Sequence, residues 1–247
     1  MGLTRGNYEG VRNIFLFNKH FYIAGVTTSL LLFVLSFLSE GGVQLLLLVA
    51  TIVALYTVFS SIAVSHYVYD KSDLYSQQWL PDLNHQKVLI INAGFDEVSH
   101  NIQAKFPACE ITVADFYNST KHTERSIKLA REMYPSTQEV VSVQTTELPF
   151  EADEFDCVIS FLAAHEIRND KERVQFFKEI NRVINHGGQV FITEHLRDGI
   201  NFLAYSLGVF HFIAKSKWLH TFKSSGFQVI NQLKVTSFIT TFILQND

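Results

Sequence analysis

Two long uncharged stretches dominate the first third of the chain. Phe21 to Leu38 and Val43 to Val68 contain no Asp, Glu, Lys or Arg, and only scattered Thr, Ser and Gln residues interrupt their apolar side chains. At ~1.5 Å per residue, each stretch forms a helix long enough to cross the roughly 30 Å hydrocarbon core of a bilayer. Ser39 to Gly42 supplies the turn between them. The pattern predicts a transmembrane helical hairpin over residues 21–69, with a buried helical pair or a dimer interface as the alternatives.

The charges on either side of this hairpin predict its orientation. Arg5, Arg12 and Lys19 precede the first stretch and Lys71 follows the second, whereas the turn carries only Glu40. Because positive residues stay on the cytoplasmic side, both termini are expected in the cytosol, as in an integral protein of a bacterial inner membrane. A cleaved signal peptide is disfavoured, since about twenty mostly polar residues come first and a second apolar stretch follows at once.

Shorter segments flank the hairpin. Residues 1–20 mix Ile14 and Phe17 with basic side chains, which suits an interfacial helix or an irregular lead-in. Residues 70–86 are mostly polar and contain Trp79, so they are interpreted as a short linker.

From residue 87 onward, short apolar runs alternate with amphipathic segments. Phe155–Phe161 and Val190–Thr193 are apolar, and Val174, Phe177 and Ile180 between them recur at helical spacing. This order is that of a βαβ unit in a buried parallel sheet. Further strands are predicted from Lys87 onward, leading into the turn at Gly94, and at Glu110–Asp115, Phe227–Leu233 and Phe238–Leu244, the last two as an antiparallel pair. We therefore expect an α/β domain over residues 87–247, mostly parallel with an antiparallel last strand.

Composition narrows the possible functions. With 247 residues, of which 47% are hydrophobic, the chain has room for one ordinary domain and the hairpin. The net charge of −4 provides no basic field for nucleic acid. Cys109 and Cys157 lie in or beside apolar strands, so they are interpreted as reduced core residues in a cytosolic compartment. No C-x-x-C pair or His/Cys cluster suggests zinc, and no metal site is predicted.

The first strand of this domain leads into a turn that suits a nucleotide. Asn92, Ala93 and Gly94 follow the apolar run, and both the small Ala93 and an Asn that tolerates positive φ permit a sharp turn. The next strand ends at Asp115, about twenty positions later, where such folds use a carboxylate to bind ribose hydroxyls. The alternative for Asp115 is a solvated strand end.

Later motifs carry a family resemblance. Leu148-Pro149-Phe150 is followed by Phe155-Asp156, His165, the run Glu179 to Val183, and Gly187-Gly188. This order resembles class I S-adenosylmethionine (SAM)-dependent methyltransferases of the small-molecule, type 11-like kind, although His186 replaces the usual proline. The resemblance implies a Rossmann-like class I methyltransferase sheet and SAM as cofactor.

The resemblance also implies where the cofactor binds. The family's turn reads as an acidic residue followed by G-x-G-x-G, and here only Gly94 is kept, with Ile90, Asn92 and Asp96 at the other positions. This degenerate turn leaves a non-catalytic relative as an alternative. The implied cofactor-binding residues are Asn92, Ala93, Gly94, Asp115, Phe116, Gln144, Thr145 and Phe161.

Four polar residues are candidates for the chemistry. His165 and Glu166 follow the fourth strand, and Glu194 and His195 end the fifth, so all four should meet at the carboxyl edge of the sheet. Together they could supply a base for a hydroxyl or amine acceptor, or bind a divalent ion. Either histidine could instead be a satisfied residue of the pocket wall.

The apolar segment Asn201 to Ile213 suggests the nature of the acceptor. It is rich in Phe, Leu and Tyr, and in the resembling family this region covers the substrate, although an ordinary core helix is the alternative. Together with the hairpin, it predicts a membrane-anchored methyltransferase acting on a lipophilic small molecule, such as a polyene, a quinone precursor or a lipid-linked phenol. The alternative function is a non-catalytic methyltransferase-like subunit that serves as a membrane-tethered scaffold.

Overall fold

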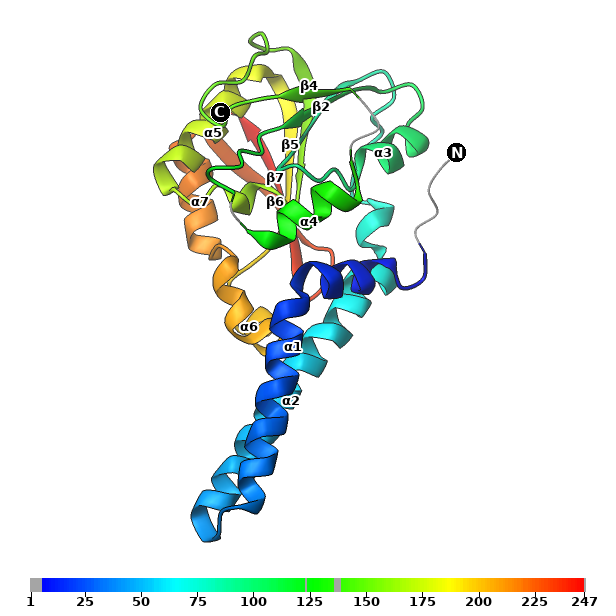
Figure 1. Ribbon diagram of the computed structural model, residues 1–247. Coiled ribbons are helices and arrows are strands. Elements are labelled where there is room, and N and C mark those ends of the chain that lie inside the picture. Colours follow the sequence, from blue (N-terminus) through cyan, green and yellow to red (C-terminus); the bar gives the residue numbers. More distant parts are fainter. Residues whose placement is uncertain (1–5, 123, 136–138, 247) are drawn as a thin grey trace.

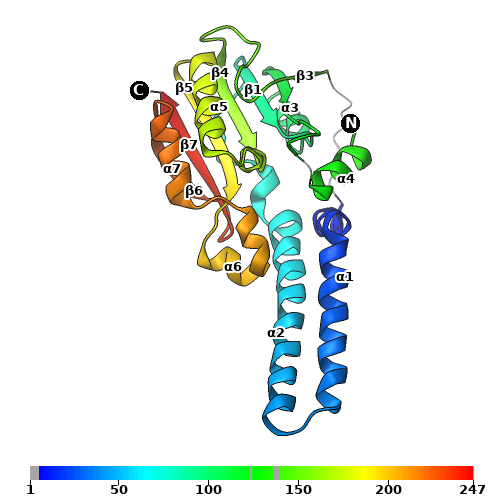
Figure 2. The same cartoon turned by 60° about the vertical axis from the view of Figure 1, so that its left-hand side comes forward.

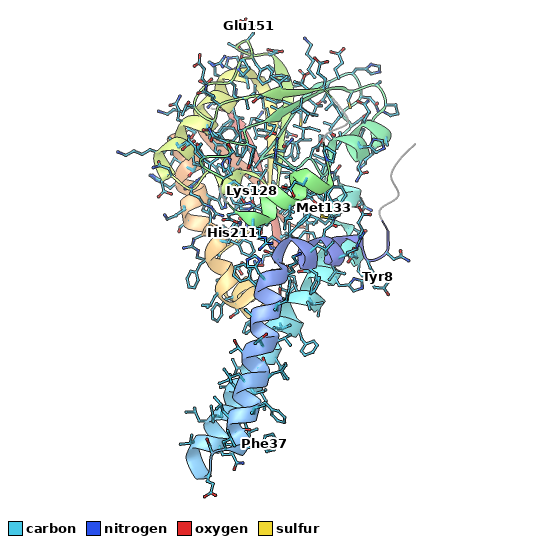
Figure 3. All side chains as sticks on the ribbon, viewed as in Figure 1. Tyr8, Phe37, Lys128, Met133, Glu151 and His211 are labelled. Atoms are coloured by element: carbon cyan, nitrogen blue, oxygen red, sulfur yellow. The ribbon has the colours of Figure 1, made fainter. Side chains whose placement is uncertain are left out.

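The computed structural model describes residues 6–122, 124–135 and 139–246. A helical hairpin projects from an α/β domain, and the two parts meet at the carboxyl edge of the sheet (Figure 1). Phe37 lies near the far end of the hairpin and Glu151 lies at the opposite end of the molecule (Figure 3).

The hairpin consists of α1 (Glu9–Phe37) and α2 (Gly41–His66). Residues 9–20 of the predicted interfacial segment and the first apolar stretch form one helix, which kinks at Asn18, where φ is −116° and ψ is 16°. The first five residues of that segment lie outside the described residues. The part before the kink lies across the hairpin axis, beneath the domain (Figure 1). A Cβ at Gly25 would lie only 2.7 Å from Val58, so this glycine allows the two helices to approach closely.

The segment after α2 is folded onto the domain. It contains a π-helical turn, η1 (Tyr67–Lys71), and a 3-10 turn, η2 (Asp73–Ser76). Val68, Leu74 and Leu83 are fully buried against one face of the sheet. The interpretation of residues 70–86 as a linker is therefore corrected, because apolar side chains spaced among its polar residues cover part of the core.

Seven strands form one sheet in the order β3-β2-β1-β4-β5-β7-β6. All neighbouring strands pair in parallel except β7, which is antiparallel to both β5 and β6. The predicted mostly parallel sheet with an antiparallel last strand is confirmed. The strands are β1 (Lys87–Asn92), β2 (Glu110–Asp115), β3 (Val140–Ser142), β4 (Phe155–Phe161), β5 (Ile184–His195), β6 (Phe227–Lys234) and β7 (Ile239–Asn246).

Side chains that alternate along the strands divide the core between the two faces of the sheet. Leu89 and Ile91 face a cluster built mainly by α5 (Asp170–Val183) and α7 (Lys215–Ser224). Val88 and Ile90 face a second cluster, built by α3 (Ser99–Lys105) and the segment after α2. The remaining helices, α4 (Arg125–Met133) and α6 (Gly199–Tyr205) with the 3-10 turn η4 (Ser206–His211), lie towards the hairpin (Figure 2).

The fifth strand is longer than the apolar run predicted for it. β5 begins at Ile184, which pairs with Phe155, and it includes Gly187 and Gly188 across a shift in register. A Cβ at Gly188 would lie 2.8 Å from the Asp156 carbonyl oxygen, so the glycine lets the two strands come together here.

Candidate functional site

The turn after β1 is held by its own side chains. The Asn92 Oδ1 atom accepts a hydrogen bond from the Gly94 N–H at 2.8 Å, and Gly94 adopts a φ of +95°. The left-handed conformation therefore lies at the glycine that the sequence retains. Ala93 is buried beside it.

Asp96 has a definite structural role in place of the missing glycine. Its Oδ1 atom accepts hydrogen bonds from the Val98 N–H at 3.1 Å and the Ser99 N–H at 3.0 Å. A carboxylate at this position satisfies free N–H groups at the start of α3 and interacts favourably with the helix dipole. The departure from the glycine pattern thus preserves a sharp turn into a helix.

Asp115 ends β2 directly beside Asn92, its partner in the parallel pairing of β1 and β2. One oxygen accepts the Tyr117 N–H at 2.7 Å, and the other lies 2.5 Å from Arg131 Nη1. The Arg131 guanidinium also lies 4.3 Å from the centre of the Tyr117 ring. A Cβ at Gly94 would collide with this guanidinium, so Arg131 of α4 lies over both the glycine turn and the Asp115 carboxylate.

A cavity of about 330 Å³ lies beyond Asp115, at the ends of β2 and β3. Its wall includes three residues predicted to bind the cofactor, namely Phe116, Gln144 and Thr145. Phe161, also predicted as a cofactor residue, instead packs in the core, with its ring centre 5.5 Å from that of Tyr75.

A short 3-10 turn after β4, η3 (Ala164–Glu166), presents His165. Leu162 enters this turn with a φ of +49°, an uncommon conformation for a residue with a branched side chain. The His165 N–H donates to Glu194 Oε1 at 3.1 Å, and His165 Nδ1 lies 2.7 Å from Glu194 Oε2. Glu194 itself is fully buried in β5. Neighbouring strands thus bring His165, Glu166 and Glu194 together, as their positions in the sequence predicted.

The structure adds His211 to this group. Glu166 Oε1 lies 3.3 Å from His165 Nε2 and 3.4 Å from His211 Nε2. The ligand atoms of these three residues all lie within 4.8 Å of one another, a set that could hold a divalent ion. Arg168 Nη2, 3.0 Å from His211 Nε2, already brings a positive charge to this position. His211 belongs to the aromatic segment that the sequence predicted to cover the substrate, and only that location could have suggested it.

Carboxylates determine the charge of this group. Burial by itself lowers the pKa of His165, but Glu194 and Glu166 outweigh burial and raise it above its ordinary value. Burial likewise raises the pKa of Glu166, and hydrogen bonds to His165 and His211 outweigh that effect and lower it. Both N–H groups of the charged His165 ring face carboxylates, Nδ1 at 2.7 Å from Glu194 and Nε2 at the longer distance of 3.3 Å from Glu166.

His195 is differently placed from His165. Its Nε2 atom lies 2.8 Å from the Tyr69 hydroxyl, and its Nδ1 atom lies 3.1 Å from the Phe238 carbonyl oxygen. The ring stacks on Phe212 with centres 4.6 Å apart. Burial lowers the pKa of His195 to about 3, so the ring is neutral at physiological pH. Both ring nitrogens already have partners in this structure.

A larger cavity, of about 920 Å³, connects the domain with the hairpin. Its wall on the domain side includes Ala93, His165 and His211, and its wall on the hairpin side includes residues of both α1 and α2. In Figure 3, His211 lies at the level where the domain meets the hairpin. The cluster of His165, Glu166 and His211 therefore faces a space whose wall on the hairpin side is formed by the apolar helices.

The first helix also contacts the elements around the turn after β1 (residues 92–95), which is called the cofactor turn because SAM is predicted to bind there. The Tyr134 hydroxyl donates to Asn13 Oδ1 at 2.8 Å, just past the end of α4. Phe17 of α1 packs edge-on against Phe95 of the turn, with ring centres 6.2 Å apart. The hairpin thus contributes directly to the surroundings of the cofactor turn.

Comparison with known sequences gives one match. Residues 104–192 match the family model described as a methyltransferase domain. Among curated proteins, no sequence is significantly similar to this chain.

Solved structures share the fold at low sequence identity. A SAM-dependent methyltransferase from Aquifex aeolicus is 13% identical with a TM-score of 0.51, over 71% of this chain and 90% of its own. An O-methyltransferase family 2 protein from Planctomyces limnophilus, in complex with apigenin, is 12% identical with a TM-score of 0.54, over 83% and 68%. PigF, in a structure with SAH, is 14% identical with a TM-score of 0.50, over 79% and 59%.

The fold of SAM-dependent methyltransferases is thus established for this chain. Residues 104–192 carry the sequence pattern of a methyltransferase domain on that fold, and this match indicates S-adenosylmethionine as the cofactor.

Proposed function

We propose that the chain is a membrane-anchored methyltransferase that transfers a methyl group from SAM to a lipophilic small molecule. The observation that carries this proposal is the cavity of about 920 Å³, because one continuous space is lined by the cofactor turn, the His165 cluster and both apolar helices. This volume lies near the upper end of the roughly 300–1,000 Å³ range of small-ligand pockets.

The residues around the cofactor turn suit SAM. Gly94 has no side chain to keep a ligand away from the backbone, and the space over it is taken by the Arg131 side chain, which SAM would displace. Asp115 is in position to accept hydrogen bonds from ribose hydroxyls, and the smaller cavity beyond it could hold the adenine between Tyr117, Gln144 and Thr145. SAM supplies a methyl group that its sulfonium already activates, so these residues need only bind and orient it.

The acceptor site combines a polar end and apolar walls. His165, Glu166 and His211 form the polar end, where an oxygen of the acceptor would take the place of Glu166 as the partner of the His165 Nε2–H group. The Ser65 and Tyr205 hydroxyls are also buried in the cavity wall. Phe17, Phe21 and Val58 supply apolar wall. An elongated apolar molecule with an oxygen at one end would match this arrangement.

The exposure of the hairpin supports membrane anchoring. In the most apolar 18-residue stretch of each helix, only 17% is buried in α1 and 11% in the helix that follows it. A core helix of a soluble protein would be mostly buried. Hydroxyl groups within the spans bond to the carbonyl of the preceding turn, as Ser29 does with Gly25 at 2.8 Å and Thr51 with Leu47 at 2.8 Å. Such internal pairing suits a helix surrounded by lipid, because water is absent there.

The test uses the full chain purified in detergent. We expect Asp115→Ala to weaken SAM binding roughly 10- to 100-fold in a calorimetric titration, since hydrogen bonds to a charged group contribute about 1.5–3 kcal/mol. Glu110→Ala, at the exposed opposite end of the same strand, is the matched control and should bind SAM as wild type does. Absence of SAM binding in wild type would support the scaffold alternative instead.

A second measurement addresses the acceptor. The full chain, supplied with SAM labelled in the methyl group and with membranes of the producing cells, should place the label in the fraction extracted by organic solvent. His165→Ala should lower this transfer ~10²-fold or more while SAM affinity stays nearly unchanged, because His165 faces the acceptor cavity. Label found only in water-soluble products would contradict a lipophilic acceptor.

A further inference from the structure

An apolar surface outside the hairpin lies on α6 and η4. Residues 199–210 contain no Asp, Glu, Lys or Arg. Most of their large apolar side chains are turned outward, although Val209 is buried, and Leu207 is 75% exposed. The exposed members of this surface are Ile200, Phe202, Leu203, Leu207 and Phe210.

Hydrogen bonds fix this surface at a defined level beside α2. The Tyr56 hydroxyl donates to the Leu203 carbonyl at 3.1 Å, and the Ser60 hydroxyl donates to the Ala204 carbonyl at 3.1 Å. Tyr56 and Ser60 precede His66, the last residue of α2, by ten and six positions, which is about 15 and 9 Å at ~1.5 Å per residue. Figure 2 shows α6 alongside the part of α2 nearest the domain.

The apolar surface of α6 and η4 is therefore continuous with the exposed apolar surface of the hairpin. Tyr56 and Phe59 of α2 are themselves more than half exposed. Basic residues flank the segment on the domain side, with Arg197 before it and Lys215 and Lys217 after it, all three exposed. Apolar side chains next to basic ones are the pattern of a segment that lies in a membrane interface, about 5–10 Å into the headgroup and acyl boundary.

Residues that line the large cavity and are also exposed mark its opening. Phe21 of α1 is 68% exposed and Leu207 of η4 is 75% exposed, and both border the cavity. His20 and Gly208, their neighbours, share these two properties. The opening thus lies between α1 and η4, at the level where both elements present apolar side chains outward, and the exposed Arg125 of α4 borders the cavity on the domain side.

We infer that α6 and η4 are immersed in the cytoplasmic leaflet and that the acceptor enters sideways from the lipid, between Phe21 and Leu207. This inference rests on the proposed function, since it requires the hairpin to span the membrane. An acceptor that reaches the cavity by this path need not leave the bilayer, so its apolar part stays out of water throughout.

Fluorescence quenching by lipid tests this arrangement. The full chain is reconstituted into phosphatidylcholine vesicles whose acyl chains are brominated near the middle, and emission is compared with that in unbrominated vesicles. Single tryptophans are introduced by Leu207→Trp and Phe21→Trp at the opening, Leu31→Trp within the hairpin, and Leu219→Trp on α7. The native Trp79 and Trp218 give a background that is measured in wild type, and unchanged circular dichroism establishes that each variant folds.

We expect bromolipid to quench the added emission of the Leu207, Phe21 and Leu31 variants but not that of the Leu219 variant, which aqueous iodide should quench. If Leu31→Trp is quenched by bromolipid and Leu207→Trp only by iodide, the hairpin spans the membrane and the inference about α6 and η4 is wrong. If Leu31→Trp is not quenched by bromolipid, the membrane anchoring in the proposed function fails, and this inference fails with it.

Discussion

At the scale of single residues, Arg131 occupies the proposed ribose site. Its guanidinium lies on Asp115, the carboxylate proposed for the ribose, and must leave before that carboxylate can serve the cofactor. Both side chains are partly exposed, and ion pairs of this kind contribute about 0.2–1 kcal/mol. We expect Arg131→Ala to bind SAM ~2- to 5-fold more tightly than wild type by calorimetry. Lys128→Ala, on the same helix, is the control. Weaker binding by Arg131→Ala would instead make Arg131 a ligand of the cofactor.

At the scale of elements, one carboxylate joins the two ends of the hairpin. The Asp70 side chain is fully buried, and its carboxylate accepts hydrogen bonds from the backbone N–H of Gly10 at 2.6 Å and of Val11 at 3.0 Å, at the start of α1. Losing such a helix cap costs about 0.5–2 kcal/mol, which corresponds to ~2–4 °C per kcal/mol for a chain of this length. Asp70→Ala should therefore lower the Tm of the full chain in detergent by a few degrees. The exposed Asp73 provides the control Asp73→Ala, and equal Tm values for the two variants would show that Asp70 does not stabilise α1.

At the scale of the whole molecule, the hairpin and the domain should depend on each other for turnover. A chain that begins at Tyr67 keeps Val68 in the core and the Tyr69 hydroxyl on His195, together with every residue proposed to bind SAM. We expect this shortened chain to bind SAM. With the same added membranes as the source of acceptor, it should methylate the organic-extractable acceptor far more slowly than the full chain does. The full chain gains because its hairpin confines enzyme and acceptor to one thin layer. Equal rates would mean that the hairpin serves localisation or partner binding.

The sequence predicted those features that local patterns determine. The apolar run Phe155–Phe161 coincides with β4, and the strand predicted to end at Asp115 ends there. The same reasoning brought His165 and Glu194 to one edge, because strand ends in a parallel sheet share an edge. Arg131 and His211 reach the site from separate elements, whose placement depends on tertiary packing and which local spacing does not reveal. The linker interpretation was wrong because Leu74 and Leu83 are isolated in sequence and become part of the core only when the segment folds back on the sheet.

The contact between Arg131 and Asp115 also bears on product release. The demethylated cofactor keeps the same ribose, so under the proposed site it competes with Arg131 for Asp115 just as SAM does. If a site binds its ligand only when Arg131 has moved away, the apparent dissociation constant equals the intrinsic one divided by the fraction of protein in that open state. This holds for SAM and for the demethylated product alike. Arg131 would thus lower the fraction of protein occupied by the spent cofactor at a given concentration. Under the proposed function, in which the acceptor arrives through the plane of the membrane, a less occupied nucleotide site can exchange the spent cofactor for SAM between two acceptor molecules.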